Sequence, residues 1–439
     1  MNPANQTSQI VDRARSTSKC GVMICCELFL AIVLVWAGSA RISLAAAEAP
    51  ATRPFMPWKS ARVLLPNENG YGPIIGVLVS NDVAYVATGI YPINVNGFLT
   101  VLKVPVNGEP VSVIGKIAAK AGPDSINMQV NNNVICLDDK DVFIRGGGDG
   151  VYDFPLDGRD PCRIDTDPAF PSHNATALAV LNGQLYLALE LSHPVETRPP
   201  EGMVKYTSRV RDGTWIVRID PKMKQMQVLA WSAQKEKALP MDGGPPVAWM
   251  AADVPRQRIV FFITAAKGNE KRSGFWSLSA SGAFKQVCPV IGSTYLERGG
   301  QPRDGKVSVG LNGCGITGLD FDLASDRPTV FYASQAVQWP KSIDDGLDRL
   351  HPRFSGNDFF YPLARTGDVL WCGNPMAQMA PGSGPRYDFP PGVLKTGNWD
   401  IDARPPKIEL SLDPTEDGKA MIAADRYGVW RIDMAVAGD

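Results

Sequence analysis

The sequence has almost no net charge. Its 439 residues include 44 Lys and Arg against 45 Asp and Glu, a formal net charge of −1. Nucleic-acid-binding proteins carry a basic surface, so we expect no nucleic-acid partner. Gly and Pro together make up about 18% of the chain, below the roughly 25% typical of low-complexity chains. These absences leave a globular protein that is long enough to bury a large core.

Signatures of catalysis are also scarce. The chain has only three histidines, His173, His193 and His351, and none lies in an H-E-x-x-H arrangement, so no zinc hydrolase is predicted. The segment Gly313–Gly318 matches G-x-G-x-x-G but leads into a strand-like sequence instead of the helix that a dinucleotide site needs. The acidic run Asp138–Asp141 lacks the alternating ligands of a calcium loop and fits a hairpin turn. We therefore predict no metal, no cofactor and no catalytic residues.

Long apolar runs are limited to the N-terminal segment. The run Leu28–Ala40 follows a polar, basic stretch and precedes small residues at Ala45 and Ala47. This order predicts that residues 1–47 are a signal peptide and that the protein is exported, to the periplasm or the extracellular space. The alternative is an uncleaved membrane anchor, because residues 21–40 are long enough to span a bilayer. Either way, membrane contact is expected only through this segment.

Cysteine pairs of the C-x-x-C type are absent. Beyond residue 47 the chain has an odd number of cysteines, namely Cys136, Cys162, Cys288, Cys314 and Cys372. A domain of this size does not need disulfides for stability. We expect no disulfide framework, with at least one thiol free or paired between chains.

What the sequence does contain is a repeat. An apolar strand, a tight polar turn, a second apolar strand, a loop and a strand opening on Gly or Asp recur in six copies. Four short antiparallel strands per copy predict an all-β fold, a six-bladed β-propeller, with seven blades as the alternative. The last copy lacks a fourth strand after Met434, so residues 60–66 are predicted to close the ring. The propeller then covers residues 60–434, and residues 48–59 form a tether.

Two stretches show a resemblance to known repeats. The sequences VAYVATG and GFLTVLKVPVNG resemble the YVTN type of β-propeller repeat, and DPTEDGKAMIAADRYGVWRID is similar to the blade shared by YVTN, TolB-like and WD40-like repeats. The resemblance covers most of residues 60–434 at the level of architecture. It implies a propeller, a fold with many unrelated functions.

The insertions between the second and third strands of the copies share one face of such a ring. They are long at about 191–212 and 335–367, and a Pro- and Gly-rich segment at 374–405 is a predicted flap. Long loops in compact domains are usually functional or disordered. The candidate binding residues on this face are His193, Arg209, Arg211, Lys271, Trp339, His351 and Arg353. The alternative is that these residues form ordinary solvated loop surface.

Two functions are compatible with these observations. The first is an exported, non-catalytic binding or assembly module that acts through the insertion-bearing face on a protein or an anionic glycan. The second is a propeller enzyme of lyase, lactonase or quinoprotein type. The absence of a catalytic motif favours the first.

Overall fold

The computed structural model describes most of the chain beyond residue 57. The described ranges are 58–66, 70–89, 96–120, 134–146, 150–166, 173–196, 207–231, 247, 249–263, 274–289, 295–312, 316–332, 335–338, 362–366, 369–372, 377–379, 411–424 and 428–435. The predicted signal peptide and most of the predicted tether lie outside these ranges. Within them, no helix is long and apolar enough to cross a membrane.

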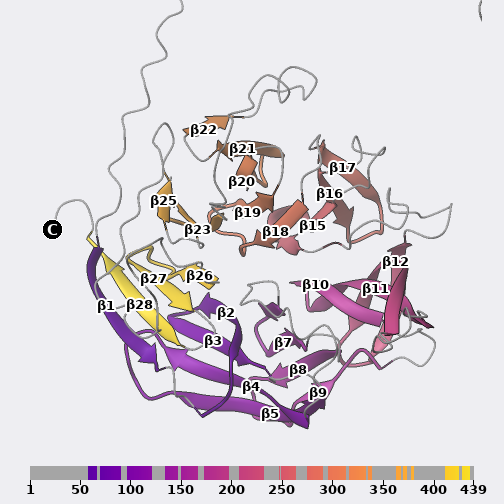
Figure 1. Ribbon diagram of the computed structural model, residues 1–439, viewed down its shortest axis with the longest axis horizontal. Coiled ribbons are helices and arrows are strands. Elements are labelled where there is room, and N and C mark those ends of the chain that lie inside the picture. Colours follow the sequence, from indigo (N-terminus) through magenta and orange to yellow (C-terminus); the bar gives the residue numbers. More distant parts are fainter. Residues whose placement is uncertain are drawn as a thin grey trace, which may run out of the picture. The chain divides into compact units, whose positions relative to one another are not determined.

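The described strands form seven antiparallel sheets (Figure 1). Sheet 1 contains β2 (Ile74–Ser80), β3 (Val83–Thr88), β4 (Asn96–Pro105) and β5 (Ser112–Lys120), and sheet 2 contains β6 (Ile135–Leu137), β7 (Asp141–Arg145), β8 (Val151–Pro155) and β9 (Cys162–Arg163). Sheet 3 contains β10 (His173–Leu181), β11 (Gln184–Glu196), β12 (Thr207–Asp220) and β13 (Gln225–Trp231), and sheet 4 contains β14 (Met250–Asp253), β15 (Arg258–Ile263), β16 (Gly274–Ser279) and β17 (Phe284–Pro289).

Three further sheets complete the described strands. Sheet 5 contains β18 (Tyr295–Gly299), β19 (Lys306–Asn312), β20 (Ile316–Asp322), β21 (Arg327–Tyr332) and β22 (Gln335–Gln338), and sheet 6 contains β23 (Pro362–Thr366), β24 (Val369–Cys372) and β25 (Ala377–Met379). Sheet 7 has the order β1-β28-β27-β26 and is made of β26 (Ser411–Pro414), β27 (Ala420–Ala424), β28 (Val429–Met434) and β1 (Trp58–Leu65).

Tight hairpins fix the register of neighbouring strands. At the predicted turns Asn81–Asp82 and Asn182–Gly183, both central residues have positive φ, between 49° and 69°. Two-residue turns with this geometry match the twist of the strands that they join, and Asn, Asp and Gly adopt it most readily. The turn residues therefore bring the apolar segments on either side into antiparallel pairs.

The core lies between successive sheets. The first strands of neighbouring sheets contact one another, as β26 contacts β2, β2 contacts β6, β6 contacts β10 and β10 contacts β14. Sheets 4 and 5 are joined by the stacked rings of Phe275 and Phe321. Sheets 5 and 6 are joined by the packing of β19 against β23. Strand β23 in turn contacts β26. Repeated antiparallel sheets packed face to face in this succession form a β-propeller architecture.

The sheets divide the strands between residues 295 and 379 differently from the sequence copies. Strands β18 and β19 open sheet 5, so β20 is its third strand and not the first strand of a copy. Their sequences, YLERG and KVSVGLN, mix charged residues with glycine and lack the apolar run that the search relied on. Strands β22 and β23 fall within the predicted insertion 335–367, and β25 within the predicted flap 374–405.

The N-terminal strand β1 pairs with β28, close to the C-terminus of the chain. The register places Arg62 opposite Arg431 and Val63 opposite Trp430. Ser60 Oγ donates a hydrogen bond of 2.8 Å to the Asp433 carboxylate. The segment predicted to pair with the last strand is therefore the one that does so, although the strand begins two residues earlier than expected.

Candidate functional site

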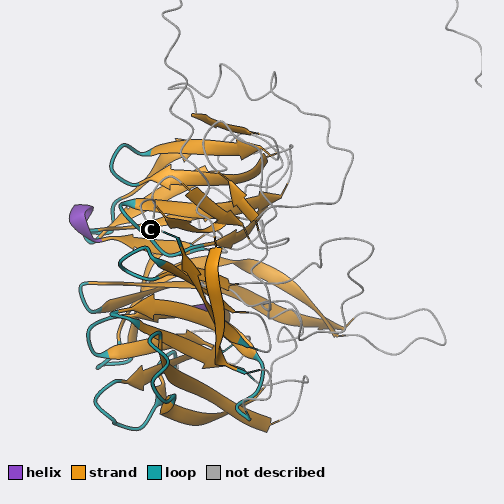
Figure 2. Ribbon diagram, turned by 90° about the vertical axis from the view of Figure 1, so that its left-hand side faces the viewer, coloured by secondary structure: helices purple, strands orange, loops and turns teal. Residues whose placement is uncertain are grey.

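One end of the sheets carries the tight turns, drawn as teal loops beside the short helix Val254–Arg256 in Figure 2. We call it the turn end. Turns of neighbouring sheets are hydrogen-bonded to each other: Asn81 N donates to Glu416 Oε1 at 2.8 Å, and Arg256 Nη2 donates to Ala324 O at 3.0 Å. Such contacts cross-link the sheets at this end.

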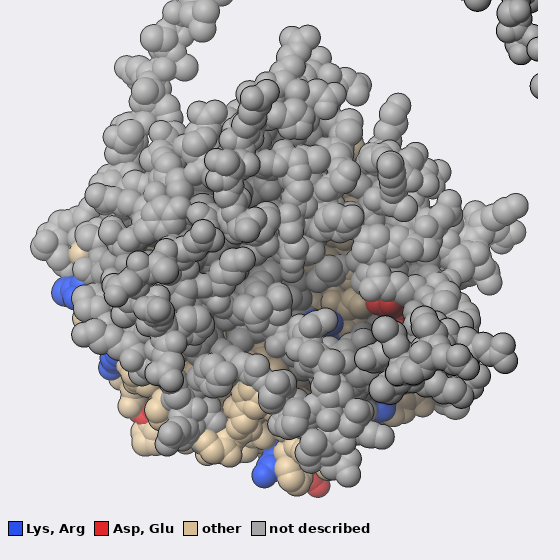
Figure 3. Space-filling view, viewed as in Figure 1, with Lys and Arg blue, Asp and Glu red and all other residues tan. Residues whose placement is uncertain are grey.

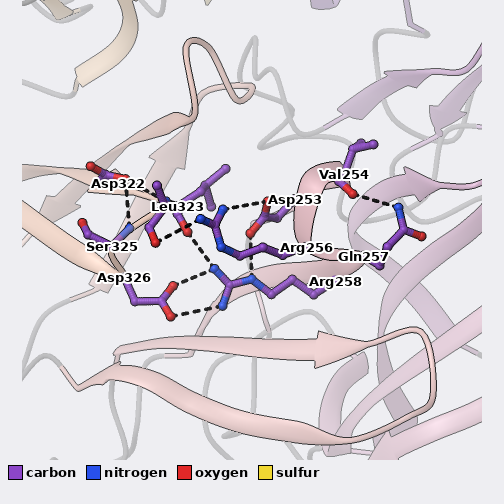
Figure 4. Close-up of polar contacts among 10 residues, drawn as sticks. Asp253, Val254, Arg256, Gln257, Arg258, Asp322, Leu323, Ser325 and Asp326 are labelled. Carbon is purple, nitrogen blue, oxygen red and sulfur yellow. Dashed lines mark hydrogen bonds and ion pairs between the residues drawn. The ribbon is translucent and has the colours of Figure 1, made fainter.

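Buried cations at the turn end are neutralised within the fold. Arg258 Nε donates to Asp253 Oδ2 at 2.7 Å, and its Nη2 donates to Asp326 Oδ1 at 2.6 Å (Figure 4). Burial lowers the pKa of Arg258, but hydrogen bonds and charge attraction from the two carboxylates outweigh it and raise the pKa overall. The guanidinium joins sheets 4 and 5, so we assign it a structural role.

A second arginine reaches across the molecule. Arg303 lies in the turn between β18 and β19 of sheet 5, yet its Nη2 lies 2.8 Å from Asp413 Oδ1 in sheet 7 and 2.7 Å from Val79 O in sheet 1. In the same turn, Gln301 Nε2 donates to Ile135 O of sheet 2 at 3.4 Å. This turn therefore contacts three sheets besides its own.

The same turn is fixed against sheet 4. Trp249 Nε1 donates to Gly300 O at 3.0 Å, and the indole is fully buried. A Cβ at Gly299 would lie 2.1 Å from the Trp249 ring, so only glycine fits there. Because five sheets meet at the β18–β19 turn, it occupies the place where the blades of a propeller converge.

The opposite end carries the predicted insertion 191–212, which the structure corrects from a loop to a ribbon. Among the described residues, Ser192–Glu196 of β11 and Thr207–Arg211 of β12 pair only with each other, beyond the last residues that β10 and β13 reach. A bulge separates this ribbon from sheet 3, since Leu191 pairs with Gly213 and Ser192 with Arg211. Bulges bend and twist the strands that contain them.

Three of the seven predicted site residues lie on the ribbon. His193 pairs with Val210, while Arg209 and Arg211 pair with Pro194 and Ser192. The other four, Lys271, Trp339, His351 and Arg353, lie outside the described residues. In the parts of the chain that the structure describes, no group of three His, Cys, Asp or Glu side chains is placed to hold a metal ion.

Arg145, at the end of β7, is a polar residue of this end that the sequence interpretation missed. Its Nη1 donates to Ala175 O of sheet 3 at 3.0 Å, while its buried Nε has no hydrogen-bond partner. Burial lowers the pKa of Arg145 to about 10, so the side chain stays charged at neutral pH. The sequence did contain one sign that Arg145 is unusual. The corresponding strand of the first copy, VAYVAT, ends in the uncharged Thr88, whereas β7 ends in arginine.

Asp153 is a second buried group with incomplete pairing. It is 7% exposed between sheets 2 and 3, and its Oδ1 accepts no hydrogen bond. Burial, and to a lesser extent the charge of Asp141, raises the pKa of Asp153 from 3.8 to about 6. The folded state therefore favours the neutral carboxyl, and holding the charged form costs stability above pH 6. This cost falls as the pH drops through 6 and vanishes below about 3.8.

We expect Asp153→Asn to stabilise the protein at pH 7.5 by about 1–3 kcal/mol, because the amide carries no charge to desolvate. At pH 4 the variant and the wild type should have nearly equal free energies of unfolding, measured by urea denaturation. Asp157→Asn is the matched control, since Asp157 lies on the surface beside Arg159. An equal gain from Asp153→Asn at both pH values would contradict the shifted pKa.

Comparisons with known proteins identify no family for this chain. No family model matches it, and no curated protein matches its sequence. Similar solved structures include virginiamycin B lyase from Staphylococcus aureus, with 11% identity and a TM-score of 0.48, covering 86% of this chain and 99% of the lyase. A GH74 xyloglucanase from Xanthomonas campestris has 15% identity and a TM-score of 0.48, over 85% of this chain and 53% of the xyloglucanase.

A third similar structure is YCF48 bound to D1 peptide, with 13% identity and a TM-score of 0.43, over 88% of this chain and 99% of the other. These similar structures thus include enzymes and a peptide-bound protein, and at such identities they assign no function to the chain. The class of protein rests on its own sheets, which have the β-propeller architecture.

Proposed function

We propose that the protein is an exported β-propeller that acts as a non-catalytic binding or assembly module through the end opposite the turns. The observation that carries this proposal is the ribbon formed by Ser192–Glu196 and Thr207–Arg211, whose described residues pair only with each other beyond sheet 3. A two-stranded ribbon is marginally stable by itself in water. A ribbon that gains stability by contacting a partner is suited to a binding role.

The proposal includes a ring of seven blades that β1 closes. Its support is the pairing of β1 with β28, together with the contacts of β26 with both β23 and β2. Adding β1 to β28 covers an edge that would otherwise be available for aggregation. Export rests on the N-terminal signal, and N-terminal sequencing of the secreted protein tests it.

The proposed partner is an anionic glycan. Positions 209 and 211 of β12 belong to one face of the ribbon, because strand positions alternate between faces. At the turn end, by contrast, the buried Arg258 and the partly buried Arg303 are already paired with carboxylates. The described Lys and Arg side chains visible in Figure 3 are separate from each other and form no patch in that view.

A binding comparison between the two ends tests this function. Replacing Arg209 and Arg211 together by Ala should weaken binding to an array of anionic glycans about tenfold or more, since each charge-assisted hydrogen bond is worth roughly 1.5–3 kcal/mol. The melting temperature should change little, because among the described residues the ribbon pairs with no strand besides its own two. The control replaces Lys222 and Lys224, both exposed in the β12–β13 turn.

Equal weakening by both pairs of substitutions, or no binding by the wild type, would remove the basis for this proposal. Unchanged affinity for the glycan after the ribbon substitutions would also contradict the proposal. The alternative of a propeller enzyme stays a prediction, and no group of the described residues specifically favours it.

A further inference from the structure

Two Asn–Gly pairs lie in turns at the turn end of the sheets. Asn107–Gly108 is in the loop between β4 and β5, and Asn182–Gly183 is the turn between β10 and β11. All four residues are exposed. Asparagine is chemically labile, because the backbone nitrogen that follows it can attack the side-chain amide. Glycine, which has no Cβ, hinders this attack least. Both pairs are therefore candidate sites of spontaneous deamidation, and the structure distinguishes between them.

The side chain of Asn107 is folded over the peptide that follows it. The backbone N–H of Glu109 donates to Asn107 Oδ1 at 3.0 Å, which forms an Asx turn. The ring closed by this hydrogen bond contains Asn107 Cγ and Gly108 N, the two atoms that would react. Asn107 Nδ2 also donates to Glu109 Oε1, at 2.9 Å. Glu109 therefore holds both polar atoms of the Asn107 side chain beside the next peptide.

The two contacts with Glu109 favour successive steps of a deamidation. The N–H on Oδ1 stabilises the negative charge that develops on this oxygen when Cγ is attacked. The carboxylate beside Nδ2 stabilises the positive charge that this nitrogen acquires before it leaves. The attack also requires Gly108 N–H to leave its hydrogen bond with Pro105 O, 3.1 Å long. Hydrogen bonds of exposed loops open at low cost in free energy.

Asn182 is held in a different way. Its turn has only two residues, because Leu181 already pairs with Gln184, and both turn residues have positive φ, 54° and 69°. Asn182 Nδ2 donates to Gln257 Oε1 of sheet 4, and among the described residues no donor contacts Asn182 Oδ1. Attack on Asn182 Cγ would require the side chain to leave Gln257 and the hairpin turn to open. The fold therefore protects Asn182.

We propose that Asn107 is a site of spontaneous deamidation in the folded protein, through attack of Gly108 N on Asn107 Cγ. The N–Cγ bond forms and the Cγ–Nδ2 bond breaks, and the departing nitrogen leaves as ammonia with the proton that Gly108 N loses. Water then opens the resulting succinimide at one of its two carbonyl carbons, which gives aspartate or isoaspartate. One water is consumed and one ammonia is released. The modification is independent of the ligand proposed for the ribbon.

The position of the loop gives the modification a structural consequence. Val106 O accepts hydrogen bonds from Arg62 Nη2 at 2.5 Å and from Arg431 Nη1 at 3.0 Å. A Cβ at Gly108 would lie 3.1 Å from Arg62 Nη1. Position 107 is therefore flanked by two residues that lie against Arg62 of β1. Deamidation adds a negative charge there, and isoaspartate also lengthens the main chain, at the point where sheet 1 meets β1.

Peptide mapping by mass spectrometry tests the site, because both Asn–Gly pairs are measured in one sample. Purified protein is incubated in mildly alkaline buffer, and conversion at each pair is followed over time. In the folded protein Asn107 should convert about tenfold faster than Asn182 or more, since the Asn182 turn must first open. In concentrated urea, where neither turn forms, the two pairs should convert at similar rates.

Two variants check the chemistry. Asn107→Gln places the amide carbon one bond farther from Gly108 N, so conversion at position 107 should be lost while conversion at Asn182 is unchanged. Glu109→Ala keeps the N–H donor but removes the carboxylate, so conversion at Asn107 should slow about two- to fivefold, the usual range for an exposed charge interaction. An unchanged rate in Glu109→Ala would show that the carboxylate takes no part.

Two results would overturn the assignment of Asn107. One is conversion of Asn182 as fast as that of Asn107 in the folded protein. The other is an intact Asn107 in the folded protein after the time in which the chain in urea is converted.

Discussion

Replacing Arg303 by Met is expected to lower the free energy of unfolding by about 3–5 kcal/mol, the usual range when one partner of a buried ion pair is removed. The Asp413 side chain is 3% exposed, and Arg303 supplies the only cation against it among the described residues. Without Arg303, the carboxylate keeps a single hydrogen bond, from Val79 N at 2.6 Å. Urea denaturation of purified protein measures the loss.

A double variant separates the ion pair from the shape of the site. Arg303→Met combined with Asp413→Leu removes both charges, so it should recover part of the lost stability, since paired apolar replacements are often tolerated. Arg159→Met removes an exposed ion pair instead and should leave the free energy of unfolding nearly unchanged. A loss below 1 kcal/mol for Arg303→Met alone would mean that the β18–β19 turn does not hold the converging sheets together.

Removal of the N-terminal strand is the second change with a large expected effect. A chain starting at residue 67 lacks β1, so β28 becomes an open edge and the buried Leu65 is lost from the cluster between sheets 7 and 1. We expect the melting temperature to fall by roughly 10 °C, as a loss of several kcal/mol implies. The open edge should also promote association, visible by light scattering.

The control for this deletion is a chain starting at residue 58. It lacks the segment before β1 but keeps the strand, so it should melt like the mature protein. If the two shortened chains have the same melting temperature, β1 does not stabilise sheet 7 and the proposed closure of the ring fails.

Much of the fold could be predicted because it is encoded locally. A continuous apolar run defines β3, and the turn residues Asn81 and Asp82 adopt the positive φ that a hairpin requires. Aromatic residues of these strands contribute to the core, since Tyr152, Trp371 and Trp430 are buried and Trp215 and Trp276 are partly buried. The unpaired apolar strand at the N-terminus also indicated its partner, because the last copy lacked a strand.

The missed features depend on contacts between distant segments. Strand β18 has too few apolar residues to be recognised alone, and it is a strand because β19 pairs with it. Arg303 looks like a solvated turn residue, yet its partner Asp413 is 110 residues away. Arg145 likewise becomes unusual only when sheet 3 covers it. These arginines are therefore less predictable than the strands, because their contacts depend on packing between neighbouring sheets.

The two ends of the sheets differ in a way that bears on function. At the turn end, Arg258 and Arg303 are paired with carboxylates within the fold, and the β18–β19 turn contacts sheets 1, 2 and 7. At the other end, a ribbon extends from sheet 3, and the Nε atom of Arg145 has no hydrogen-bond partner among the described residues. A ligand of opposite charge has more to gain at the second end.

Amide hydrogen exchange with and without a hexuronate oligosaccharide tests the binding face most directly, because it needs no substitution. The proposed function predicts slower exchange on ligand binding in residues 191–196 and 207–213, where the ribbon leaves sheet 3, and unchanged exchange in the turns at residues 221–224 and 300–305. Protection confined to those turns, or equal at both ends, would contradict the assignment of the ribbon end as the binding surface.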